Sequence, residues 1–225
     1  MKVRFFYLFV LCFLSGCAGY HFNNANNPLI GYDIRSISVP MFVNRSVLPQ
    51  MAGVMTKEIV LALKDFSGLR VVNGDDNDSD GVLIGIVESN DHYDEVVQTT
   101  ATTYTDTPTN QNIKQSIGRR QDFYYPNTTS YNLQLKVILV KRPSKEDIEF
   151  LTKNTLGLAK FHPKVVLTEI LPITGSFSRV ISDNLTSSSG GEVNFVKNKG
   201  IFEKSLQDSC LQTAKNFKQV VLNAF

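Results

Sequence analysis

The sequence predicts an α+β fold, with a mixed sheet of roughly four strands and two helices packed on one face of it. Residues 50–66 and 201–225 repeat apolar side chains every three or four positions, which is typical of amphipathic helices. Short stretches before, between and after these helices are apolar or alternate apolar with polar residues, which predicts strands. The 225 residues suffice for one domain with a substantial core.

The first residues have the pattern of a secretory signal peptide. Lys2 and Arg4 precede an uncharged apolar run over residues 5–14, which is about half the length that a membrane-spanning helix needs. No second long apolar run follows. We therefore expect residues 1–16 to be removed, and the mature chain not to span a membrane.

The end of that signal resembles the bacterial lipobox, because Leu14-Ser15-Gly16-Cys17 fits its pattern. The resemblance implies cleavage after Gly16 and fatty acylation of Cys17, and several acyl chains hold a protein to a bilayer stably. Ala18 in place of an aspartate implies sorting to the outer membrane under the enterobacterial rule. The alternative is an ordinary signal with a chance cysteine at the cut.

Charge and cysteine content narrow the possible roles. The sequence has 23 basic and 21 acidic residues, and removal of the signal takes away Lys2 and Arg4. The mature chain is therefore neutral, and nothing in its charge suggests a nucleic-acid partner. With Cys12 in the signal and Cys17 acylated, Cys210 is left alone and no disulfide can form within the mature chain.

The part after Cys17 divides into a tether and one domain. Residues 23–33 are rich in Asn and hold a Pro and a Gly, so we expect a lipidated N-terminus and short tether over 17–33 and a single domain over 34–225. A first strand is predicted from Ile34, where Ile37, Val39 and Met41 alternate with polar residues. The helix over 50–66 follows, then strands at 69–72 and 81–87, which suggests a parallel crossover connection.

The second half of the domain contains two loop-rich inserts, 91–130 and 141–164. Polar residues dominate the first insert, which predicts a long loop or a mobile hairpin with a strand-like part at 96–104. A strand over 131–140 follows, with Tyr131, Leu133, Leu135, Val137 and Leu139 on one face. In the second insert, residues 144–161 have helical spacing, and Ser144 with Asp147 is a possible helix cap.

The last part of the chain is expected to return to the sheet and then form the closing helix. Residues 165–181 predict a strand or a bent hairpin, interrupted at Pro172 and Gly175, and residues 187–191 form a flexible loop. In the closing helix, Cys210 falls on the apolar face, where it serves as a small hydrophobic residue.

Little in the sequence indicates catalysis. His21, His92 and His162 lie far apart, and residues 75–80, although rich in Asp, lack the glycine and final glutamate of a calcium loop. No phosphate-binding glycine loop or nucleophile elbow is present. We therefore expect no enzyme activity, cofactor or metal. The basic pairs 119–120 and 141–142 can hold anionic groups, although a solvated loop or strand end is the commoner explanation of such pairs.

Three stretches resemble the lipopolysaccharide-assembly lipoprotein family, LptE. The mature start 17–22, Cys-Ala-Gly-Tyr-His-Phe, fits the way members begin, and residues 34–46 fit the family's Ile-x-x-Ile-x-Val-Pro-x-Phe-x-Asn-x-Ser/Thr strand, which a helix follows. Residues 79–87 match a third strand pattern, with Ser79 and Gly81 departing at small-residue positions. The two inserts are longer than the family pattern.

The resemblance implies a lipid-anchored outer-membrane lipoprotein without enzymatic activity. Such a protein plugs the lumen of the outer-membrane barrel LptD and helps lipopolysaccharide reach the outer leaflet. Basic side chains in the family contact lipopolysaccharide phosphates, and Lys136, Lys141 and Arg142 are the candidates here.

The alternative is a lipoprotein resembling LpoB, an activator of a peptidoglycan synthase. That family shares a Val-x-x-Phe-x-Asn-x-Ser/Thr strand followed by a helix. Its tether is usually long, whereas the tether expected here reaches at most about 55 Å. The short tether favours a partner at the membrane.

Overall fold

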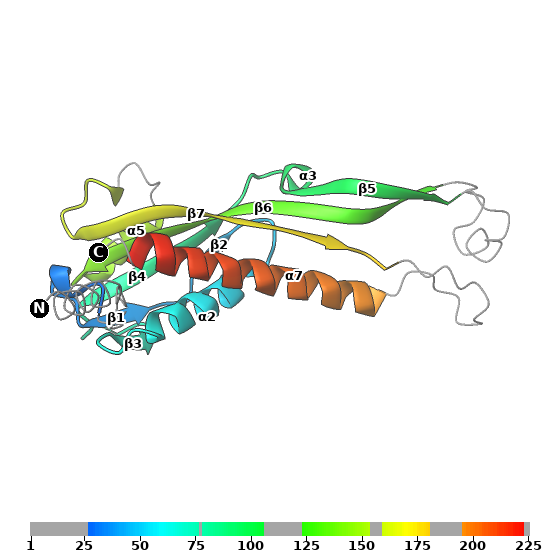
Figure 1. Ribbon diagram of the computed structural model, residues 1–225. Coiled ribbons are helices and arrows are strands. Elements are labelled where there is room, and N and C mark those ends of the chain that lie inside the picture. The colour runs from blue at the N-terminus through cyan, green and yellow to red at the C-terminus, as the bar shows by residue number, and fades with distance from the viewer. Residues whose placement is uncertain (1–26, 77, 106–122, 154–158, 181–194, 223–225) are drawn as a thin grey trace, which may run out of the picture.

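The computed structural model describes residues 27–76, 78–105, 123–153, 159–180 and 195–222. These residues form a mixed sheet of seven strands with helices packed on it. One end of the molecule is a broad body, and a long, narrow arm extends from it (Figure 1). The predicted signal peptide, Cys17, His21, residues 119–120 and the loop 187–191 lie outside the described ranges.

The body contains the parallel strands. β1 (Ser36–Val39) lies between β3 (Arg70–Asn73) and β4 (Gly81–Glu88) and is parallel to both, and α2 (Met51–Lys64) connects this part of the chain to β3. The expected parallel crossover is therefore present. The first strand ends at Val39, before Pro40, and Met41 is 69% exposed rather than buried in the strand. The chain then pairs with β4 a second time through β2 (Val43–Arg45).

The longest strand, β6 (Phe123–Lys141), joins the body to the arm. On one side, β5 (Val97–Thr105) pairs with its first half and β4 with its second half, and β7 (Val165–Ser178) runs along the other side. The short helix α3 (Tyr93–Val96) links β4 to β5. The strand predicted over 131–140 is thus part of a longer one, and the first insert contributes both strands of an antiparallel hairpin.

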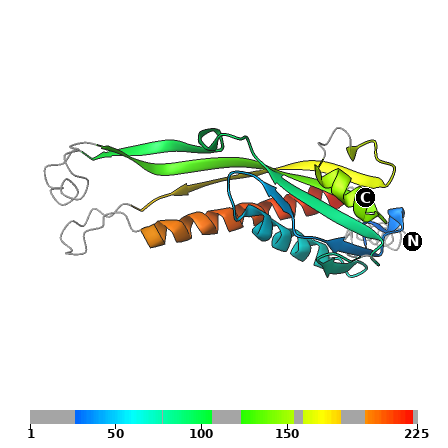
Figure 2. The ribbon, with the colours of Figure 1, turned by 180° about the vertical axis from the view of Figure 1, so that it is seen from behind.

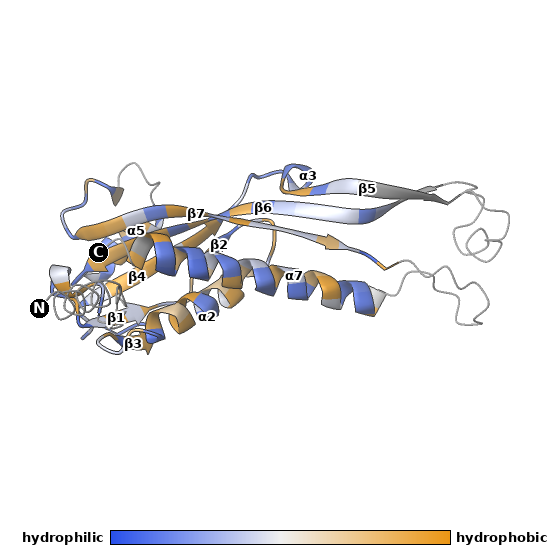
Figure 3. Cartoon of the chain, in the orientation of Figure 1, coloured by the Kyte–Doolittle hydropathy of each residue, from blue (hydrophilic) through white to orange (hydrophobic). Residues whose placement is uncertain are grey.

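Two helices cover one face of the sheet, as predicted. α2 and α7 (Phe195–Asn216) pack there, and α7 continues as a π-helical turn, η2 (Phe217–Leu222). The odd-numbered β6 residues Leu133, Leu135 and Val137 are at most 1% exposed beneath these helices. Figure 3 shows the apolar residues of the body gathered between the sheet and the helices, with hydrophilic residues on the outer side of α7.

A third helix covers the opposite face of the body. α5 (Lys145–Lys153) begins at the predicted cap, where the Ser144 N–H donates to the Asp147 carboxylate (2.7 Å) and the Asp147 N–H donates to Ser144 Oγ (3.2 Å). Leu151 of this helix packs on Ile84 and Ile138. The second insert therefore builds a small core on the face opposite the two predicted helices.

The interruption expected at Pro172 and Gly175 is wrong, because β7 is one continuous strand paired with β6 from Val165 onward. Pro172 is tolerated in an edge strand, which leaves one side of the backbone without a strand partner. At Gly175, a Cβ atom would lie 2.2 Å from Tyr131 Oη. The glycine is required by this close approach and makes no turn.

The domain also begins earlier than predicted. Leu29 is 1% exposed, the Asn27 amide donates to the Ile34 carbonyl (2.6 Å), and η1 (Ile30–Tyr32) follows. Residues 27–33 therefore belong to the fold. The chain between Cys17 and Asn27 reaches at most about 35 Å when extended.

Candidate functional site

The arm is the part of the molecule with the most unusual surface. It consists of β5, the first half of β6 and the second half of β7, with α7 along one face, and both views show it projecting beyond the body (Figures 1 and 2). β6 alone spans roughly 60 Å at the usual rise per residue of a strand. The two faces of the arm have different chemistry.

On the first face, polar side chains of α7 bond to the backbone of β7 and of Val180, two residues after its end. Three of them donate to carbonyl oxygens spaced four residues apart: Thr213 to Pro172 (3.1 Å), Ser205 to Ser176 (3.0 Å) and Asn198 to Val180 (3.3 Å). The Asn198 carboxamide also accepts the Val180 N–H at 2.9 Å. These bonds occupy backbone carbonyl groups on the unpaired side of β7, which is an edge strand. A further strand can therefore pair with β7 only poorly.

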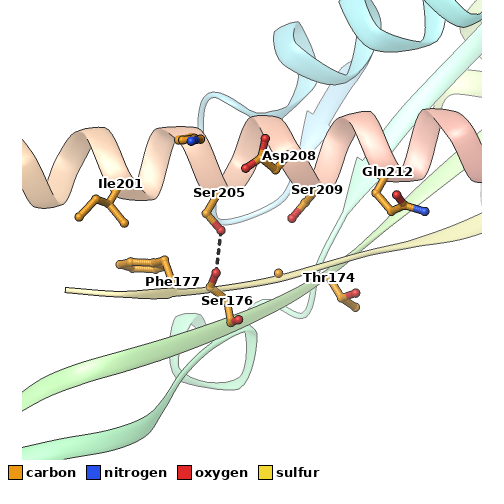
Figure 4. A pocket seen from close by; sticks show the side chains of 10 residues that line it. Thr174, Ser176, Phe177, Ile201, Ser205, Asp208, Ser209 and Gln212 are labelled. Carbon is orange, nitrogen blue, oxygen red and sulfur yellow. Dashed lines mark hydrogen bonds between the residues drawn. The ribbon is translucent and has the colours of Figure 1, made fainter. Parts of the chain in front are cut away.

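A groove of about 560 Å³ lies between β7 and α7, and Figure 4 shows the side chains that line it. Tyr131 Oη reaches it from β6 and bonds with Ser205 Oγ (2.9 Å) and Ser209 Oγ (2.7 Å). Burial raises the pKa of Tyr131, so this hydroxyl stays protonated. None of the described histidines is among the lining residues, and the two serine hydroxyls in the groove are bonded to Tyr131.

The second face of the arm is open. Register places the following residues of β6, β7 and β5 on it, all polar and uncharged apart from two prolines: Pro126, Thr128, Ser130, Asn132, Gln134, Pro172, Thr174, Ser176, Ser178 and Gln98. α5 covers this face only over the body, where Leu151 packs on it. We call this row of residues the open face.

A hollow of about 270 Å³ lies where the open face meets α3. Its polar lining includes Glu88, Asn90 and Glu95 from the β4–α3 segment and the exposed amides of Asn132 and Gln134 from β6. Glu88 pairs with Arg45 outside the lining (3.6 Å), and Glu95 accepts a hydrogen bond from the Asn90 amide (3.1 Å). The hollow therefore contains carboxylates and amides, with no lysine or arginine in its lining.

Lys136 is buried, which the strand pattern did not predict. Its side chain is 2% exposed on the face that α5 covers, and desolvation lowers its pKa, an effect that Glu88 opposes. Burial argues against a direct contact with lipopolysaccharide at this position.

Lys141 and Arg142 lie together at the far end of β6, apart from Lys136. Lys141 pairs with Asp33 at 3.5 Å, and Arg142 pairs with Asp33 at 4.0 Å and with Asp80 at 3.9 Å. Asp80 is itself held by the backbone N–H groups of Arg35 and Ser36, both at 3.0 Å, and these bonds lower its pKa. The contact of Lys141 and Arg142 with lipopolysaccharide stays a prediction.

The two other candidate groups, His162 and Cys210, are engaged in contacts that stabilise the fold. His162 lies 3.3 Å from Asp147, whose hydrogen bond with Lys164 holds its pKa well below the usual range. Cys210 is fully buried, which raises its pKa to about 12 and agrees with the predicted apolar role. Across the described ranges, no three His, Cys, Asp or Glu side chains are grouped to hold a metal, and no helix is long and apolar enough to cross a membrane.

Sequence reasoning missed the open face and the hollow. The signal was present in the polar residues at even positions from Thr128 to Gln134. The low apolar content of residues 91–130 predicts a long loop or a mobile hairpin there, and this prediction does not extend the strand at 131–140 back to Thr128. The bonds between α7 and β7 have no sequence signal, because they join residues about 20 to 40 positions apart.

Comparison with known proteins gives similarity in fold only. No protein-family model matches the sequence, and no curated protein matches it. Among solved structures, a candidate lipoprotein from Caulobacter crescentus CB15 is 6% identical with a TM-score of 0.40, over 82% of this chain and 89% of the other. A DUF330-family protein from Xanthomonas campestris is 8% identical with a TM-score of 0.38, over 82% and 84%. Lipoprotein GNA1162 from Neisseria meningitidis is 11% identical with a TM-score of 0.30, over 75% and 96%.

Proposed function

We propose that this chain is a lipid-anchored outer-membrane lipoprotein that binds inside the barrel LptD as a plug and supports the insertion of lipopolysaccharide into the outer leaflet. The resemblance of residues 17–22, 34–46 and 79–87 to the LptE family motivates the proposal. The arrangement of α2 and α7 on one face of the sheet agrees with what that resemblance implies.

The open face of the arm is the observation that carries the proposal. A protein inside a barrel meets a polar, hydrated wall, because lumen-facing strand positions of such barrels are polar. The open face offers hydroxyl and amide groups without charge, so it can form hydrogen bonds to such a wall at little desolvation cost. The tether, at most about 35 Å long, keeps the domain close to the membrane in which the barrel lies.

We further propose that the protein acts by binding and carries out no reaction. The Ser205 and Ser209 hydroxyls are engaged with Tyr131, and the one described cysteine is buried with a raised pKa. Neither environment provides an activated nucleophile.

Co-purification tests the proposal. The full chain carrying a C-terminal affinity tag is extracted in mild detergent, and we expect a barrel of much larger mass to remain bound. The Thr174→Glu variant places a charge on the open face and should lose most of the barrel, whereas Leu211→Glu, on the 41% exposed Leu211 of α7, should retain it. Recovery of the native protein as a lone monomer would contradict the proposal.

Activation of a peptidoglycan synthase, as in LpoB, is the second candidate function. The folded residues 27–33 shorten the expected tether, which weakens this candidate, although the length of the arm extends the reach of the protein. Depletion separates the two: lipopolysaccharide accumulating in the periplasm supports the first function, and weakened wall synthesis supports the second.

A further inference from the structure

We infer that the hollow between α3 and the open face binds the sugar rings of a glycan chain. The inference goes beyond the proposed function, because a protein can contact a barrel without any sugar. It depends on three properties of the hollow: its free hydrogen-bonding groups, the sign of its charge and its size.

Free hydrogen-bonding groups come from β6. Asn132 and Gln134 are two positions apart on the same face of the strand, and both side chains are exposed. Neither side-chain amide bonds to any residue that the structure describes, whereas the nearby Asn90 amide is committed to Glu95. Each free amide offers donors and an acceptor, so the pair can bond to adjacent hydroxyl groups of one ring.

The charge of the hollow selects against anions. Glu88 and Glu95 contribute carboxylates, which accept hydrogen bonds from hydroxyl groups and repel phosphate. Two cations lie near Glu88 but not in the lining: Arg45 is engaged with Glu88 and with the Thr152 carbonyl of α5, and Lys136 is buried. The hollow therefore differs in ligand class from a phosphate site built of lysine and arginine.

The carboxylates of the hollow do not form a metal site. Two carboxylates, one of them paired with an arginine, fall short of the six to eight oxygen ligands that Ca²⁺ prefers, and the described residues contain no group of three metal-ligating side chains. The volume of about 270 Å³ lies just below the range of roughly 300–1,000 Å³ for drug-sized ligands and suits one or two sugar rings. Beyond the hollow, Thr174 and Ser176 continue the hydrogen-bonding surface along which a longer glycan can lie.

Titration of the purified full chain with defined glycans tests the inference. The first probe is the core oligosaccharide released from lipopolysaccharide by mild acid and then dephosphorylated, and the second is a disaccharide of N-acetylglucosamine and N-acetylmuramic acid. Binding is followed in ¹⁵N-resolved spectra by the backbone N–H signals of the residues around the hollow, which every variant retains, and in the native chain also by the side-chain NH₂ signals of Asn132 and Gln134. We expect at least one probe to shift these signals, with a dissociation constant on the order of 0.1–1 mM.

The double variant Asn132→Ala/Gln134→Ala should weaken binding at least about tenfold, the loss expected when two hydrogen bonds of roughly 1 kcal/mol each are removed. The matched control is Thr128→Ala/Ser178→Ala, on the same face but outside the hollow, where the two hydroxyls bond to each other at 3.0 Å. This control should bind as the native chain does. Both variants change exposed or half-buried residues, and native-like spectra establish that each is folded.

The outcomes separate this inference from the proposed function. Binding of the lipopolysaccharide core supports both, and binding of the peptidoglycan disaccharide alone supports the sugar site while favouring the alternative function. The inference is overturned if neither glycan shifts the signals, if inorganic phosphate competes for the site, or if the double variant binds as well as the control. Co-purification of the native chain with a barrel is a separate measurement, so the proposed function can fail while the sugar site stands, and the reverse.

Discussion

The body and the arm use the same sheet in different ways. In the body, both faces of β6 are covered: Leu135 lies beneath α2 and α7, and Ile138 lies beneath α5. In the arm, only the side that faces α7 is covered, and the other is the open face. A sheet covered on both sides is held by apolar burial, whereas a sheet with an exposed polar side retains surface for a partner.

This difference assigns separate tasks to the two regions. Substitutions in the body should change stability, and substitutions on the open face should change binding with little effect on stability. Between these extremes lies the contact of α7 with β7, where polar side chains hold the arm together.

The largest loss of stability is expected from Leu135→Ala in the body. Leu135 is fully buried, and removal of a buried leucine side chain typically costs about 3 kcal/mol through lost burial and the cavity that remains. Urea denaturation measures the change. Leu211→Ala, at a position 41% exposed on α7, serves as the control and should stay within about 0.5 kcal/mol of the native value. Similar losses in the two variants would show that the core is not where the structure has it.

Gly175→Ala should cost about 2 kcal/mol, because the new methyl group meets Tyr131 Oη at 2.2 Å and Ser209 Oγ at 2.4 Å. The tyrosine ring is buried and has little room to move. Gly200→Ala is the control and should increase stability. A Cβ added at Gly200 meets no neighbouring atom within 4 Å, and alanine in a helix is favoured over glycine by about 0.5–1 kcal/mol. Thermal unfolding of the two variants should shift in opposite directions, and a shift in the same direction would refute the close approach at Gly175.

Tyr131→Phe should cost about 1 kcal/mol, because it removes the hydroxyl that joins Ser205 and Ser209 of α7 to β6. The ring itself stays packed against Phe202, so the loss is confined to the hydrogen bonds. Combining it with Ser209→Ala should cost less than the sum of the two single changes, since both remove the same bond. Strict additivity of the two changes in urea denaturation would argue against that bond.

Sequence periodicity predicted the helices and strands that bury a single apolar side. The helix over 50–66 and the strand over 131–140 are both present, because each has a single buried stripe that local spacing reveals. Lys136 is a candidate lipopolysaccharide contact in the sequence, because nothing near it in the chain signals that α5 packs on that face. Pro172 and Gly175 have the composition of a turn, yet pairing with β6 and the packing of Tyr131 determine their conformation. Long-range contacts thus decided the burial of Lys136 and the course of β7, and also the face that remained open.

The smallest effect expected is electrostatic and belongs to the body. Hydrogen bonds from the Arg35 N–H and the Ser36 hydroxyl lower the pKa of Asp80 below its ordinary value of 3.8. The native state therefore binds fewer protons than the unfolded state in this range, so the contribution of Asp80 to stability is complete above about pH 4 and is lost as the pH falls through the lowered pKa. Asp80→Asn should destabilise the protein at pH 7, and the difference from the native chain should shrink as the pH is taken below 4. Chemical denaturation at a series of pH values measures this. A difference that is the same at pH 7 and at pH 2 would mean that the shape of the side chain, and not its charge, stabilises the contact between β1 and the turn before β4.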